Sequence, residues 1–111
     1  MDAFEMAPLV AEQNQQNLAY LEFLRTPSLS LGLYKLAAGA VDLQVPHSED
    51  EVYYVVKGQG TILVGTEHRE VEAGSIIFVG AHVEHRFHTI TEDLLVLVFF
   101  APAEGSQSTH P

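Results

Sequence analysis

Cysteine is absent from the 111-residue chain, and basic residues are scarce. Without cysteine there is no disulfide framework, no thiolate metal site and no cysteine nucleophile, so any metal must be held by nitrogen and oxygen ligands. Acidic residues outnumber basic ones 15 to 5, which gives a formal net charge of −10. Because that charge repels phosphate backbones and anionic lipids, we expect neither a nucleic-acid partner nor a membrane partner.

Long apolar runs are missing as well. No stretch approaches the ~20 apolar residues of a membrane-spanning helix. The first seven residues contain acidic side chains where a secretory signal peptide carries basic ones. We therefore expect a cytoplasmic protein. The chain is long enough for one domain that buries roughly two thirds of the surface of its unfolded form.

Short runs of β-branched and aromatic residues, separated by glycine, predict an all-β domain. The predicted strands are 18–25, 29–36, 52–57, 61–64, 68–71, 76–79, 84–89 and 94–100, and one predicted turn is 58–60. Strands spaced by roughly 8 to 12 residues are typical of a sandwich or barrel.

Three segments follow from this pattern. Residues 1–17 form an N-terminal arm that is either extended or a short helix, residues 18–101 form the barrel, and residues 102–111, rich in small polar residues, form a flexible tail. The run 94–100 (LLVLVFF) is apolar on both faces, so we expect the barrel interior to cover one side and a partner sheet or subunit the other. This run, together with the strand 18–25 that could pair across a subunit edge, predicts a homodimer.

The candidate ligands for a metal stand where polar segments enter apolar strands. His47 and Glu51 lie in a loop that leads into strand 52–57, and His85 stands near the start of a later strand after a glycine turn. Two imidazoles and one carboxylate leave coordination positions open, whereas structural zinc sites are usually closed by four ligands. The sequence therefore predicts a divalent metal centre holding Fe, Mn, Ni or Zn; the alternative is an acidic loop without function.

Strand alternation extends this hypothesis to neighbouring residues. Tyr53 shares a face with Glu51, so it either lines the pocket or fills the core with its hydroxyl bonded. Phe87 shares a face with His85 and is a candidate for lining the pocket, while His88 faces the surface. His82, on the turn before His85, is either a fourth ligand or an acid or base beside the metal.

These residues resemble the first motif of the cupin superfamily. That motif is a glycine, five residues, His-x-His, three or four residues, a glutamate, six residues and a glycine. Gly39, His47, Glu51 and Gly58 match it in register, with His47 in the place of the second histidine. Val45 stands in the place of the first histidine, which implies that its side chain points into the barrel beside the metal and lines the pocket.

The second cupin motif is present in part. It is a glycine, five residues, Pro-x-Gly, two residues, a histidine, three residues and an asparagine, and Gly74 and His85 match its glycine and histidine. Gly80, His82 and Thr89 replace its proline, glycine and asparagine. The resemblance covers about residues 29–100 and implies a small single-domain cupin with a jelly-roll fold, the double-stranded β-helix, and a metal inside the barrel.

Two functions fit these residues. The first is a mononuclear metal enzyme of the dioxygenase, isomerase or lyase type acting on a small organic molecule. The second is a non-catalytic cupin module that binds a small ligand or a metal. The chain has five Lys and Arg residues in all, so few cations are available to bind a phosphate group of a substrate.

Overall fold

The computed structural model describes residues 1–106, and within them the chain forms one helix and six strands. The elements are α1 (Met6–Gln15), β1 (Tyr20–Thr26), β2 (Leu29–Leu36), β3 (Asp50–Val64), β4 (Glu67–Glu72), β5 (Ile76–Val79) and β6 (His85–Ala101). The strands pair antiparallel in the order β1-β2-β6-β3-β4, and β5 pairs with β3. Helix α1 decides between the two alternatives for the N-terminal segment.

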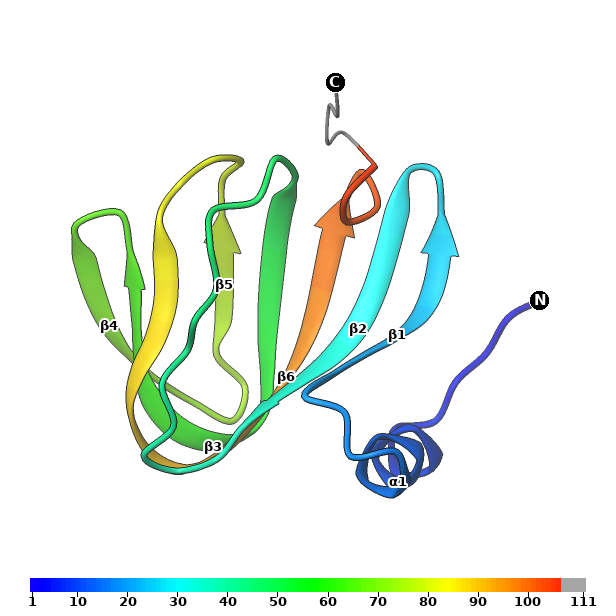
Figure 1. Ribbon diagram of the computed structural model, residues 1–111, viewed down its shortest axis with the longest axis horizontal. Helices are drawn as coiled ribbons and strands as arrows, with labels where there is room; N and C mark the ends of the chain where they lie inside the picture. Colours follow the sequence, from blue (N-terminus) through cyan, green and yellow to red (C-terminus); the bar gives the residue numbers. More distant parts are fainter. Residues whose placement is uncertain (107–111) are drawn as a thin grey trace.

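The two longest strands, β3 and β6, determine the shape of the molecule. They pair from Asp50 and Ala101 at one end to Val64 and His85 at the other. Both strands bend strongly, so they form the base and the walls of an open cup, and segment 37–49 crosses this cup without regular secondary structure (Figure 1). Strands β1 and β2 extend one wall, and α1 lies below them (Figure 1).

The predicted turn at 58–60 is wrong, because these residues continue β3. Gly58 has a φ of 100°, and the ladder between β3 and β6 shifts register around it, from Val55 to Thr61. A Cβ at position 58 would collide with the carbonyl oxygen of Asp93. The glycine therefore lets β6 pass close by while β3 bends without reversing. The segments 84–89 and 94–100 likewise belong to one strand, β6.

The core fills the inside of the cup, where alternate residues of β3 and β6 meet. Tyr53, Val55 and Val96 are fully buried, and Val98 and Phe87 are 2% and 1% exposed. Burying each such side chain contributes about 1.5–3 kcal/mol to stability. Packing in this core therefore fixes the positions of the residues that flank the site described below.

The outer face of the same sheet is only partly covered. Helix α1 packs on it at Leu33, where the Gln13 amide Nε2 donates a hydrogen bond to the Leu33 carbonyl at 3.0 Å. Farther along, Leu97 and Phe99 of β6 are half-buried. The sequence predicts that a partner sheet or subunit covers the second face of 94–100. Within the single chain, this face is only partly buried.

The first residues of the predicted flexible tail, 102–106, contact the barrel. Ala103 is buried, the Glu104 N–H donates to Ser30 Oγ at 2.9 Å, and Arg25 donates to the Glu104 carbonyl at 2.8 Å. These contacts hold residues 102–106 against β1 and β2, and they depend on groups that are distant in sequence. Residues 107–111 of the predicted tail lie outside the described part of the chain. Within residues 1–106, the single helix is too short and too polar to cross a membrane.

Candidate metal centre

Three side chains selected from the sequence come together inside the cup. His47, Glu51 and His85 each offer one nitrogen or oxygen atom within 4.8 Å of the others. His85 Nε2 lies 3.2 Å from Glu51 Oε1, and His47 Nε2 lies 3.8 Å from the same oxygen. Ligands about 2.1 Å from one ion are roughly 3 to 3.5 Å apart when adjacent, so a small contraction of this group would suit a divalent metal.

Opposite ends of one strand pair supply two of these side chains. Glu51 is near the start of β3, where it pairs with Phe100 and Val79, whereas His85 begins β6 and pairs with Val64. They meet across the interior because both strands curve. Glu51 and His85 are 1% and 2% exposed, so the carboxylate lies in a nearly water-free environment.

The atoms that face one another here lack hydrogen-bond partners. Within residues 1–106, His47 Nε2, both carboxylate oxygens of Glu51 and His85 Nε2 are buried and accept or donate no hydrogen bond. Leaving one such group unsatisfied costs about 1–3 kcal/mol, and more if it is charged. A bound metal would satisfy all three side chains, so the residues present fit a divalent ion.

The backbone orients His85 for metal binding. Its Nδ1 lies 2.9 Å from the Val83 carbonyl oxygen, which can only accept a hydrogen bond. The proton of the neutral ring is therefore on Nδ1, and the lone pair of Nε2 points at Glu51 and His47. Burial opposes protonation, but the Glu51 carboxylate, 3.2 Å from Nε2, and the Val83 carbonyl outweigh it and raise the pKa of His85. A metal must displace that additional proton.

His47 is held by contacts from three parts of the chain. Its ring packs edge-on against Phe100 at 5.1 Å, its Nδ1 lies 3.8 Å from Glu104 Oε2, and its carbonyl accepts a hydrogen bond of 2.6 Å from the His82 N–H. Burial raises the pKa of Glu104, although His47 acts in the opposite direction. At 3.8 Å the Glu104 oxygen lies beyond hydrogen-bond distance of His47 Nδ1, so Glu104 would have to move closer to accept that proton and direct Nε2 at an ion.

The remaining predicted site residues take different positions. Tyr53 is buried, donates to Gln44 Oε1 at 3.3 Å and packs 5.1 Å from Phe87, which corresponds to the core-filling alternative. Phe87 is also in the core. The side chain of His82 is exposed and is not part of the ligand group found within residues 1–106. His82 contacts the site through its backbone alone.

The expectation that Val45 points into the barrel is wrong. Its side chain is 68% exposed, like Val41 and Leu43 before it. Segment 41–45 is extended but outside any ladder, and it turns Asp42 and Gln44 inward. The alternation of inward and outward side chains is interrupted at Pro46. His47 therefore faces the interior, whereas Val45 does not.

Sequence reasoning missed Asp42, which is 4% exposed. It accepts hydrogen bonds from the Tyr34 hydroxyl at 2.8 Å, the Phe87 N–H at 2.9 Å and the Gln44 amide at 2.9 Å. The alternation of apolar and polar residues in 41–45 could have indicated that Asp42 points inward. Tyr20 and Glu104, also missed, lie far from both motifs in sequence, and no local pattern identifies them.

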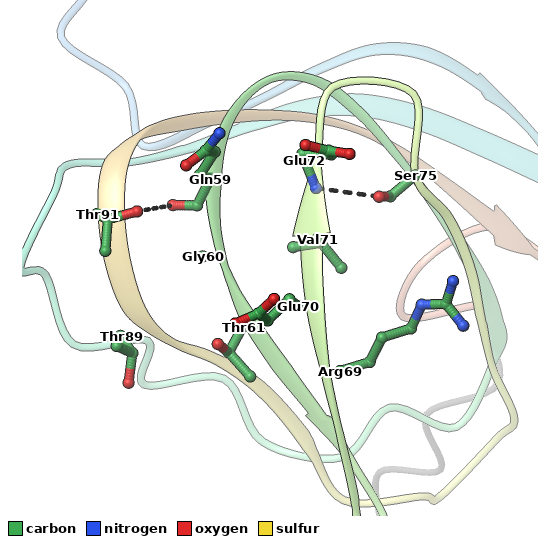
Figure 2. A pocket seen from close by; sticks show the side chains of 10 residues that line it. All are labelled: Gln59, Gly60, Thr61, Arg69, Glu70, Val71, Glu72, Ser75, Thr89 and Thr91. Carbon is green, nitrogen blue, oxygen red and sulfur yellow. Dashed lines mark hydrogen bonds between the residues drawn. The ribbon is translucent and has the colours of Figure 1, made fainter.

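Two cavities differ in their relation to this centre. One of about 200 Å³ opens beside His47 and is lined by Tyr20, Tyr34, Gln44, His47, Val98, Phe100 and Glu104. A larger one of about 550 Å³ lies between β4, β3 and β6 (Figure 2). The residues that line the larger cavity include none of the candidate ligands, whereas His47 lines the smaller one.

Comparison with known proteins concerns the family and the fold of the chain. The family model described as "Cupin domain" matches residues 32–100. An uncharacterized protein of Streptomyces coelicolor is 51% identical over 105 residues, which cover 95% of this chain and all of that protein. A solved structure from Thermus thermophilus, named TT1209, has a TM-score of 0.76 at 26% identity and covers 93% of this chain and 99% of that one.

The fold class has direct support as well. A protein from Methanocaldococcus jannaschii, described as having a double-stranded β-helix fold, has a TM-score of 0.68 at 18% identity over 75% of this chain and 78% of that one. This likeness concerns the fold alone. It confirms the all-β jelly roll expected from the sequence.

Proposed function

The chain belongs to the cupin domain family, and from that premise we propose that it is an enzyme in which His47, Glu51 and His85 hold one divalent metal. The observation that carries the proposal is the set of buried nitrogen and oxygen atoms on these residues that have no hydrogen-bond partner within residues 1–106. Each of them is a good ligand for Fe, Mn, Ni or Zn.

The chain's own residues prepare the site for such an ion. The Val83 carbonyl fixes the tautomer of His85, the Glu104 carboxylate lies 3.8 Å from His47 Nδ1, and Phe100 packs against the His47 ring. When bound, the metal would supply Lewis acidity or, as Fe(II), oxygen activation. We therefore propose chemistry of the dioxygenase, isomerase or lyase type.

The cavity beside His47 favours a small substrate. Its volume of about 200 Å³ is below the ~300 Å³ at which ordinary ligand pockets begin. No Lys or Arg lines it, so a phosphate group would find no cation there. We infer a small organic molecule as the substrate. The net charge of −10 supports the proposal that the protein has neither a nucleic-acid nor a membrane partner. A place in the cytoplasm remains the proposal made from the first seven residues and the missing apolar run.

Metal analysis with a matched pair of variants tests this proposal. Protein purified without chelators or a histidine tag should contain about one metal per chain, and Glu51→Ala should abolish it. Glu70→Ala, which removes an exposed carboxylate of the larger cavity, should retain it. Equal metal content in all three proteins would contradict the site. Metal without turnover of any small oxygenated molecule would favour the non-catalytic module.

We also propose that two copies associate through the outer face of β5, β3 and β6. Tyr54 pairs with Ile76 and Leu97 there, next to the row in which Val52 pairs with Phe78 and Phe99. Ile76 and Phe78 are 69% and 63% exposed in the single chain, and such apolar patches mark interfaces. Light scattering should give a dimer at micromolar concentration and a monomer for Phe78→Glu; a native monomer would contradict the proposal.

A further inference from the structure

Besides the candidate ligand His47, one other residue that lines the smaller cavity has a buried polar atom without a hydrogen-bond partner in the described chain. The Tyr20 hydroxyl is buried and has no hydrogen-bond partner within residues 1–106. The other hydroxyl of the cavity is committed, since Tyr34 donates to Asp42 at 2.8 Å. The Gln44 amide is committed too, because it donates to Asp42 and accepts from Tyr53.

The backbone opposite Tyr20 is shaped to receive its ring. Gly32 stands in the middle of β2, where glycine is unfavourable for a strand. A Cβ at Gly32 would collide with the ring and the hydroxyl of Tyr20. The glycine therefore allows the phenol to lie over β2, edge-on to Tyr34 at 6.4 Å between ring centroids, and the hydroxyl of this cavity-lining residue is buried.

We propose that Tyr20 is a ligand-binding residue whose hydroxyl donates a hydrogen bond to a carbonyl or hydroxyl oxygen of a small molecule bound at the metal. This inference rests on the proposed function, because the metal holds the other end of the molecule. A phenol keeps its proton at neutral pH, so the group is a donor. The ligand relieves the cost of the unpaired hydroxyl, which makes the bond more valuable than one at an exposed site.

The other walls narrow the chemical class. Val98 and Phe100 are apolar, the Glu104 carboxylate accepts hydrogen bonds, and no Lys or Arg lines the cavity. A ligand that fits donates from a hydroxyl to Glu104, accepts from Tyr20 and has no charge away from the metal. Small neutral hydroxycarbonyl compounds meet these conditions, whereas phosphorylated compounds and dicarboxylates do not.

Two probes that differ by one oxygen test the assignment. Dihydroxyacetone and hydroxyacetone share the hydroxyketone unit that can bind a metal, and the first has one further hydroxyl. We measure their dissociation constants with the Co²⁺-loaded protein from changes in its visible absorption. The native protein should prefer dihydroxyacetone by about 5- to 10-fold, the usual value of one hydrogen bond. In Tyr20→Phe this preference should fall below about 2-fold.

The matched control is Tyr34→Phe, which removes a hydroxyl already bonded to Asp42 and should keep the preference. Co²⁺ affinity, measured in the same titrations, separates the two proposals. If native protein binds Co²⁺ but Tyr20→Phe keeps the preference, or neither probe is preferred, this inference is wrong and the metal site stands. Native protein that fails to bind Co²⁺ would overturn both.

A second measurement needs neither metal nor ligand. Removing an unpaired buried hydroxyl should leave the melting temperature of the metal-free protein unchanged or raise it, whereas Tyr34→Phe should lower it by several degrees. A drop in Tyr20→Phe equal to that in Tyr34→Phe would mean that the Tyr20 hydroxyl serves the fold, and it would overturn the assignment.

Discussion

The candidate metal centre and the larger cavity of Figure 2 both involve β3 and β6 but are opposite in character. At the centre, Glu51 and His85 are almost fully buried and their facing atoms are unpaired. In the larger cavity the polar side chains are mostly exposed, and local bonds satisfy some of them, such as the 3.0 Å bond from the Glu72 N–H to Ser75 Oγ (Figure 2).

Volume alone therefore does not identify a site in this molecule. The larger cavity has about 550 Å³ against 200 Å³ beside His47, yet water can satisfy its exposed groups. Unpaired buried donors and acceptors are the rarer feature, because native proteins leave few of them. Such atoms therefore point to a ligand more strongly than open space does.

Removing a histidine on each side of β6 should separate the two regions most clearly. His85→Ala removes a ligand and should weaken Zn²⁺ binding by at least about 100-fold, since even residues behind metal ligands contribute 10- to 100-fold. His88→Ala removes an imidazole that bonds to His68 at 2.9 Å outside the cup and should change affinity less than about 2-fold. Competition with a chelator measures both, and similar losses would contradict the assignment.

Buried and exposed carboxylates should differ in their contribution to stability. Asp42→Ala leaves the Phe87 N–H and the Tyr34 hydroxyl without an acceptor, so it should lower the free energy of unfolding by about 2–5 kcal/mol. Glu72→Ala at the larger cavity should stay within about 0.5 kcal/mol. Urea denaturation measures both values, and a small effect of Asp42→Ala would show that water replaces the carboxylate.

The pKa values of two histidines, one in each region, should be shifted in opposite directions. The raised pKa of His85 means that its ion pair with Glu51 stabilises the metal-free protein fully below the unfolded pKa near 6.5, and that this stability is lost as pH rises through the folded pKa. Burial, His68 and Arg86 lower the pKa of His88 instead. Proton NMR should give midpoints on opposite sides of 6.5, and Zn²⁺ should remove only the titration of His85.

The smallest effect on metal affinity is expected from a substitution of Val45. Because its side chain is 68% exposed, Val45→His should change metal affinity less than about 2-fold instead of supplying a fourth ligand. The same chelator competition measures it. A gain of about 10-fold or more would mean that segment 41–45 turns over when a ligand is offered.

Local spacing made the fold and the grouping of the three candidate ligands predictable, whereas contacts between residues distant in sequence could not be predicted. His47, Glu51 and His85 stand beside β-rich runs with glycine at fixed spacing, and strand alternation placed Tyr53 and Phe87 inward. The expectation for Val45 came from its place in the motif, and motif spacing does not tell which way a side chain points in a segment outside a ladder. Tyr20 and Glu104 contribute through a pairing of β1 with β2 and a turn after β6, which no local pattern specifies.

The position of the ligands at opposite ends of the β3–β6 ladder bears on how the protein folds and unfolds. Glu51 and His85 come together only after strands distant in sequence have paired and bent, and such all-β folds typically take ~1 ms to seconds to form. A metal that binds the finished cup and not the open chain should slow unfolding much more than it speeds folding. The ion would then bind after the strands have paired and would slow their separation. The lifetime of the native state would therefore depend on the supply of metal.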